Sequence, residues 1–135
     1  YALGLKGSYD PFGGRVIFAP SSAYNWTEAN TDQDSTGAFT YSLVTSTPLN
    51  KELTASVTLK ETKTRRNGAD TSVSNLVRRD DAFNYALTLS WRKPGPPSAL
   101  VPTVALTHSE TETDSNILNF NTRTRDTNLA LTWVF

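Results

Sequence analysis

Apolar and polar residues alternate with a period of two along most of the chain. The clearest run starts at Phe83 and ends at Trp91, and every second residue in it is Phe, Tyr, Leu or Trp. Successive side chains of a β-strand point to opposite faces of its sheet, so this pattern predicts strands with one apolar and one polar face. No stretch of useful length has apolar residues at helical spacing. The pattern therefore predicts an all-β fold.

Seven segments show this alternation. Pro20 and Ser22 interrupt the apolar face of the second segment, which is unfavourable in an interior strand. Short turns are expected near 10–14, 47–51 and 93–98, and longer polar connections near 29–37, 65–80 and 110–116. Short turns at one end of a sheet and long loops at the other are typical of outer-membrane barrels. The segments lie at about residues 1–9, 15–28, 39–43, 53–60, 83–92, 103–107 and 128–135.

Aromatic residues of the apolar faces gather at the two expected ends of the strands, with aliphatic residues between them. Aromatic girdles around an aliphatic band mark the two interfaces of a membrane barrel. One expected girdle contains Tyr9, Phe18 and Trp91, with Trp133 and Phe135 at the same level. The other contains Tyr24, Trp26, Phe39, Tyr41, Phe83 and Tyr85.

The opposite faces carry mainly Thr, Ser, Asn and Ala, and Thr alone accounts for 20 of 135 residues. Such a face suits a hydrated lumen better than a sandwich core. The sequence therefore predicts one domain, residues 1–135. This domain is expected to be an antiparallel up-and-down transmembrane β-barrel, or the C-terminal seven or so strands of one. A soluble β-sandwich or lipocalin-like binding module is the alternative, because such domains alternate as well.

Charge and cysteine content narrow the function classes. Thirteen basic and thirteen acidic residues balance, which argues against a nucleic-acid partner. The absence of Cys excludes disulfides and thiolate sites. Tyr1 is expected to follow a removed signal peptide, a proteolytic cut or an upstream segment. Seven is an odd count, whereas single-chain bacterial barrels normally have even counts, so further N-terminal strands or a partner chain are expected to complete the barrel.

No constellation for catalysis, a metal or a cofactor is predicted, and the protein is expected not to be an enzyme. His108 is the only histidine, and nothing near Ser109 or Asp114 resembles a nucleophile elbow. Glu110, Glu112 and Asp114 alternate and offer oxygen ligands for a divalent cation, but a solvated hairpin tip is the favoured interpretation.

Several basic residues suggest contacts at the membrane surface or in the lumen. Arg65, Arg66, Arg78 and Arg79 flank the expected loop at 65–80 and could bind lipopolysaccharide phosphates, with an ordinary charged loop as the alternative. Lys60 and Arg92 fall on the polar face. They would either line a channel or pair with acidic neighbours such as Asp126, and pairing is favoured in a narrow lumen.

The C-terminus resembles the signal by which outer-membrane barrels are recognised for assembly. Leu129, Leu131, Trp133 and the terminal Phe135 occupy alternate positions. This resemblance implies a bacterial outer-membrane location, with membrane lipid, lipopolysaccharide and the barrel assembly machinery as partners.

A second, weaker resemblance covers about the last 35 residues. Pro102, the tip at 115–117, Arg123 and Arg125 are similar to the end of surface lipoprotein assembly modifier barrels and of polysaccharide-secreting barrels. It implies a non-enzymatic role in moving a solute, polymer or lipoprotein across the outer membrane, although the periplasmic repeat domain of the modifiers has no counterpart here. A small structural or adhesion barrel with a plugged lumen is the alternative.

Overall fold

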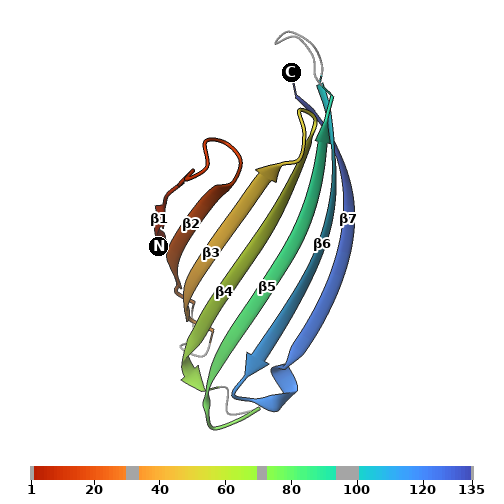
Figure 1. Ribbon diagram of the computed structural model, residues 1–135. Helices are drawn as coiled ribbons and strands as arrows, with labels where there is room; N and C mark the ends of the chain where they lie inside the picture. The colour runs from red at the N-terminus through yellow and green to blue at the C-terminus, as the bar shows by residue number, and fades with distance from the viewer. Residues whose placement is uncertain (1, 30–33, 70–72, 94–100, 135) are drawn as a thin grey trace.

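The computed structural model describes residues 2–29, 34–69, 73–93 and 101–134. Its seven strands form one sheet in sequence order, each antiparallel to its neighbours (Figure 1). The predicted all-β, up-and-down arrangement of seven antiparallel strands is therefore confirmed. The strands are β1 (Ala2–Lys6), β2 (Ile17–Thr27), β3 (Thr36–Pro48), β4 (Leu53–Ala69), β5 (Val77–Arg92), β6 (Val101–Ser115) and β7 (Thr122–Val134), with one 3-10 turn, η1 (Leu118–Phe120).

The sheet is open, so the seven strands do not close into a barrel by themselves. β1 and β7 form its two edges and do not pair with each other. Six antiparallel steps separate them, so both edge strands run in the same direction. Single-chain bacterial barrels have even strand counts and join antiparallel strands throughout, and two parallel edges do not fit that closure. A barrel closed by this chain alone is therefore not observed, and a portion of a larger barrel stays a prediction.

Pro20 explains why β1 ends early and why β2 still pairs on both sides. The Gly7 amide donates to the Pro20 carbonyl over 3.0 Å, but proline has no N–H with which to return a bond. Pairing resumes where Tyr9 and Phe18 exchange two hydrogen bonds of 2.8 Å. The missing donor thus faces the edge strand β1, while the rest of β2 pairs with β3 along its whole length.

The turn after β1 forms where the sequence predicts it. Gly13 and Gly14 have φ values of 61° and 86°, in the left-handed region where side chains are disfavoured. The Asp10 carboxylate accepts hydrogen bonds from the backbone amides of Phe12 and Gly14. This short polar side chain therefore holds the reversal together.

Two stretches predicted as polar loops are largely strand. β4 continues to Ala69 and β5 begins at Val77, and β6 runs through the expected tip to Ser115. The true tip lies at η1, where the Asn116 side chain accepts from the Arg79 amide over 2.8 Å. Residues 70–72 and 94–100 lie outside the described residues, so the predicted difference in connection length stays a prediction. Both faces are polar in the two stretches predicted as loops, and alternation in hydropathy disappears although the backbone stays extended.

The two faces of the sheet have opposite character. We call them the apolar face, which carries Leu87 and Leu129, and the hydroxyl face, which carries Thr88 and Thr107. The large apolar side chains are strongly exposed, at 51% for Leu87 and 70% for Leu129, while Thr and Ser on β4 and β5 are half-buried. No described side chain is both large and fully buried. A curved sheet crowds its concave side, so the lower exposure of the hydroxyl face indicates that it is concave.

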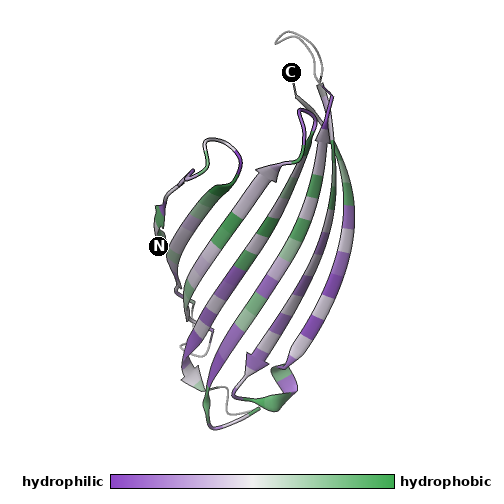
Figure 2. Cartoon of the chain, in the orientation of Figure 1, coloured by the Kyte–Doolittle hydropathy of each residue, from purple (hydrophilic) through white to green (hydrophobic). Residues whose placement is uncertain are grey.

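Hydrophobic residues gather toward one end of the strands. Figure 2 shows hydrophobic stretches on β3 to β7 toward the Trp91 end and hydrophilic stretches toward η1. We call these ends the Trp91 end and the η1 end. Strands stop close to the apolar stretch at the Trp91 end, whereas β4, β5 and β6 continue well beyond it at the η1 end. No helix among the described residues is long and apolar enough to cross a membrane.

Candidate functional site

The apolar face carries a continuous band of aliphatic and aromatic side chains across the sheet. Residues that are opposed in the strand register lie on the same face of the sheet. In each of the strands from β2 to β7, every second residue of one stretch therefore belongs to this band. Aromatic residues lie mainly toward the ends of these stretches and leucines between them, as on β5. The stretches are Phe18–Trp26, Phe39–Leu43, Leu53–Leu59, Phe83–Trp91, Val104–Leu106 and Leu129–Leu131.

This apolar band crosses the hydrogen-bonded rows at an angle. The row through Ser22, in the middle of the β2 stretch, passes Phe83 and reaches β7 at Arg123. The leucines of β7 lie further on, and Leu131 is eight residues beyond Arg123. Along the strand this offset is eight rises of about 3.3 Å, and across the sheet the distance is five strand spacings of about 4.8 Å. The ratio of these two lengths corresponds to strands tilted by roughly 45–50° from the normal of the band.

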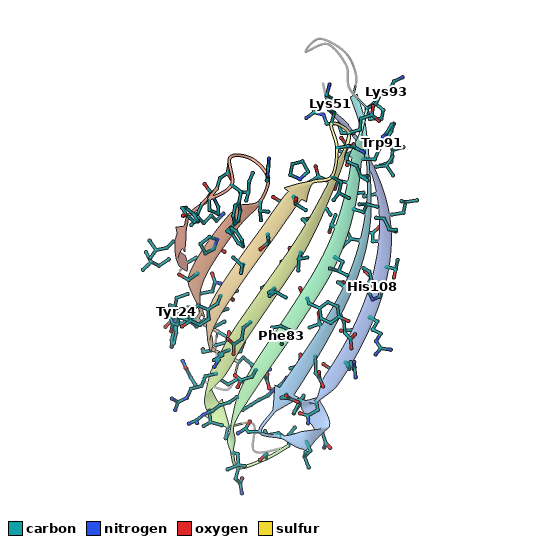
Figure 3. The ribbon with its side chains drawn as sticks, in the orientation of Figure 1. Tyr24, Lys51, Phe83, Trp91, Lys93 and His108 are labelled. Atoms are coloured by element: carbon teal, nitrogen blue, oxygen red, sulfur yellow. The ribbon has the colours of Figure 1, made fainter. Side chains whose placement is uncertain are left out.

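The predicted girdle residues whose side chains are described share the apolar face. Tyr24 and Phe39 lie on adjacent strands with ring centroids 6.3 Å apart, and Phe39 and Tyr41 are 4.6 Å apart. Figure 3 shows Trp91 at the end of the sheet where Lys51 and Lys93 lie, with Tyr24 and Phe83 toward the η1 end. Trp91 thus lies toward one end of the strands and Tyr24 and Phe83 toward the other, while the two girdles and their role at a membrane interface stay a prediction.

Two band aromatics hold polar partners at opposite ends. The Trp91 indole donates to the Glu52 carboxylate over 3.0 Å in the turn between β3 and β4. The Tyr85 hydroxyl donates to the Glu110 carboxylate over 2.6 Å toward the η1 end. Each ring thus lies over the apolar surface with its polar group directed to a charge, the arrangement expected at an apolar–aqueous boundary.

Glu110 is the centre of a charge cluster that the sequence analysis missed. Its side chain is only 8% exposed, and its carboxylate pairs with Arg123 and, over 3.2 Å, with Arg125. Alternating acidic and basic residues on either side of a hairpin were the signal for this pairing. With Tyr85 donating as well, the Glu110 oxygens are occupied. Within the described ranges, no group of His, Asp and Glu is placed to hold a metal ion.

The four arginines proposed for lipopolysaccharide contact fall on strands and divide between the faces. Arg65 and Arg79 are directly opposed and exposed on the apolar face beyond the band. Arg66 and Arg78 lie on the hydroxyl face, where Arg66 pairs with Asp34 over 3.6 Å and Arg78 with Asp80 over 2.8 Å.

Arg78 has a second contact, since its guanidinium lies 3.7 Å above the Phe120 ring of η1. Both hydroxyl-face arginines are thus engaged within the chain. Of these four arginines, only Arg65 and Arg79 lie on the apolar face.

Hydroxyl and amide groups of neighbouring strands meet on the hydroxyl face. Thr88 and Thr107 are joined over 3.0 Å, and Asn84 donates to Thr111 over 2.8 Å. Lys60 and Arg92 share this face by register. In the described part of the chain, no ion pair involves either of these two residues, and the predicted pairing with Asp126 is not seen. The face is thus weakly charged and rich in hydroxyl groups.

His108 does not assemble with a serine and an acid. It lies on the apolar face, where its Nδ1 is 2.9 Å from the Thr127 hydroxyl, whereas Ser109 lies on the hydroxyl face. The structure therefore does not bring this candidate triad together.

Two of the four residues of the C-terminal signal are placed with their side chains. Leu129 and Leu131 lie exposed on the apolar face of the edge strand β7. The Trp133 backbone pairs with Pro102, while its side chain and all of Phe135 lie outside the described residues. Comparison of the chain with protein-family models, with curated proteins and with solved structures found no match.

Proposed function

We propose that this sheet forms part of the wall of a transmembrane β-barrel in a bacterial outer membrane. Its apolar face contacts lipid and its hydroxyl face borders the lumen. The observation that carries this proposal is the inverted burial, with large apolar side chains more exposed than Thr and Ser. A fully exposed Leu forgoes roughly 1.5–3 kcal/mol, and the large apolar side chains of the band are about half exposed, so ten of them forgo roughly 7–15 kcal/mol. That is comparable with the total stability of about 5–15 kcal/mol of an ordinary domain.

The layout of the band favours lipid over a second protein layer. The stretches from Phe18 to Trp26 and from Phe83 to Trp91 each span nine residues. A tilted transmembrane strand needs about 9–11 residues. Strand tilts of about 35–45° are usual in outer-membrane barrels, close to the slope of the band. A protein layer would require neither aromatic edges nor this slope.

Further strands complete the barrel in this proposal. Because β1 and β7 run in the same direction, an odd number of antiparallel strands is needed between them. A second copy in the same membrane orientation would present a parallel edge to β7, so strands from elsewhere in a longer chain, or from a different partner chain, fit better. β7 would carry the contact with the barrel assembly machinery through Leu129, Leu131, Trp133 and Phe135.

The role of the barrel is transport or secretion without catalysis. The hydroxyl face offers a weakly charged, hydrated surface along which a polar solute, a polymer or a lipoprotein could move. Lys60 and Arg92 would add positive charge to this path.

Detergent dependence tests the barrel proposal directly. The full chain should be recovered in the outer-membrane fraction, require detergent for extraction and migrate differently on gels with and without heating. A chain that is soluble and monodisperse without detergent would contradict the proposal and favour a soluble binding module.

A further inference from the structure

Four strands contribute to one row of apolar-face residues that starts at the edge of the band on β2 and lies beyond the band on β3, β4 and β5. The row joins Trp26 on β2, Gly37 on β3, Arg65 on β4 and Arg79 on β5. Gly37 has no side chain, and the Trp26 ring lies 3.4 Å from the position that a Cβ would occupy there. The missing side chain thus leaves space for an aromatic ring beside the first arginine.

Arg65 and Arg79 form an arrangement that is unfavourable without an anion. Like charges directly opposed on adjacent strands destabilise a sheet. Lys63 pairs with Glu61 over 3.2 Å and stands opposite Asp81. Neither Arg65 nor Arg79 takes part in any ion pair found in the described ranges. Two opposed guanidinium groups match the oxygens of a phosphate, which each can bind through two hydrogen bonds.

Two adjoining grooves connect this pair to the apolar band. One, of about 310 Å³, is lined by Arg65 and Arg79 with Lys63 and Asp81. The other, of about 420 Å³, is lined by Arg65 together with aromatic side chains and Gly37. Arg65 belongs to both. The aromatic members of the second groove are Tyr24, Trp26 and Phe39.

We propose that Arg65 and Arg79 bind the phosphate of an outer-leaflet glycolipid, whose acyl chain lies in the aromatic groove and continues over the band. This inference rests on the proposed function, because the site faces lipid only if the apolar face does. Free phosphate would use the arginines but not the aromatic groove. An amphiphile uses both, which is why a lipid is the occupant we assign.

A double substitution with a matched control tests this site. The variant Arg65→Gln/Arg79→Gln removes the two outward arginines, and Arg66→Gln/Arg78→Gln removes their sequence neighbours on the other face. The full chain is purified in detergent, incubated with lipid A and analysed by native mass spectrometry. Binding should weaken about tenfold or more in the first variant and stay within about twofold in the second.

Two further arms separate the sources of phosphate and guard against misfolding. Dephosphorylated lipid A should bind as weakly to the wild type as lipid A binds to the first variant, and millimolar inorganic phosphate should displace lipid A poorly. If the first variant fails to fold, Arg65→Lys/Arg79→Lys takes its place in the test. This variant keeps the two positive charges and should bind lipid A with an intermediate affinity.

Several results would overturn the glycolipid site. These are equal lipid A binding by the first variant and the wild type, no preference for the phosphorylated lipid, or ready displacement by inorganic phosphate. Heat-dependent gel migration of the wild type is measured in parallel. If it shows a folded membrane protein while lipid A binding fails these tests, only the lipid site is lost. If it does not, the barrel proposal fails as well.

Discussion

Leu87 and Thr88 are neighbours in β5 whose side chains lie on opposite faces of the sheet. Leu87 lies in the middle of the apolar band, and Thr88 is joined to Thr107 across the hydroxyl face. An arginine at Leu87 would enter the centre of the lipid layer, which costs roughly 2–4 kcal/mol in outer-membrane barrels. Leu87→Arg should therefore lower the stability in lipid vesicles by that amount, measured by denaturant titration.

Thr88→Arg is the matched control for this substitution. The same charge on the hydroxyl face borders water, so its cost should stay below about 1 kcal/mol. Equal losses for the two variants would contradict the assignment of the faces. A larger loss at Thr88 would indicate that the hydroxyl face is the one packed against an apolar phase.

Glu110 supplies a second prediction for single residues. Its carboxylate accepts from Tyr85, Arg123 and Arg125, so removing its charge leaves two arginines on β7 without their partner. Glu110→Gln should lower the denaturant midpoint of unfolding. Glu112→Gln, at a residue that opposes Arg123 without an ion pair to it, should lower the midpoint less. Indistinguishable midpoints for both variants and the wild type would show that the cluster does not stabilise the hairpin.

Among the elements, the pairing of β1 with β2 is limited by one missing hydrogen-bond donor. Pro20 accepts from Gly7 but cannot donate in return. Pro20→Ala should restore the second hydrogen bond and join the β1 ladder to the Tyr9–Phe18 bridge. The amide of residue 20 should then be protected from hydrogen exchange, whereas the amides at Leu87 and Thr88 should not change. Rapid exchange at residue 20 would mean that Pro20 is not what ends β1.

The strands were predictable from sequence where one face is apolar and the other is not. Phe83 to Trp91 alternates cleanly, and the strand there forms as expected. At Arg65, Arg79 and Glu110 both faces are polar, so hydropathy alternation carried no signal, and pairing across the hairpin decides the structure. Pro20 was recognised as unfavourable for an interior strand, but which neighbour its missing donor would face depends on the register with β1.

The candidate site was predictable only in part for the same reason. The four arginines of the expected loop were identified by their charge. Once this segment is known to be strand, the alternation of side chains places Arg65 and Arg79 on one face, and Arg66 and Arg78 on the other. Gly37 carries no signal in a single sequence. Its importance arises because register places it between Trp26 and Arg65.

For the whole molecule, the account depends on which phase each face contacts. The sheet has no packed core among the described residues, its band has the slope of tilted transmembrane strands, and its edges run parallel. The lack of a packed core is unfavourable in an isolated soluble domain. In the barrel proposal, an apolar phase contacts one face and additional strands lie between β7 and β1.

The most direct test uses the absence of native Cys in the chain. Leu87→Cys and Thr88→Cys are labelled one at a time with an environment-sensitive fluorophore, and the protein is inserted into vesicles containing nitroxide-labelled acyl chains. The account predicts strong quenching and blue-shifted emission at residue 87, with weak quenching and water-like emission at residue 88. Equal quenching at both residues, or stronger quenching at residue 88, would contradict it.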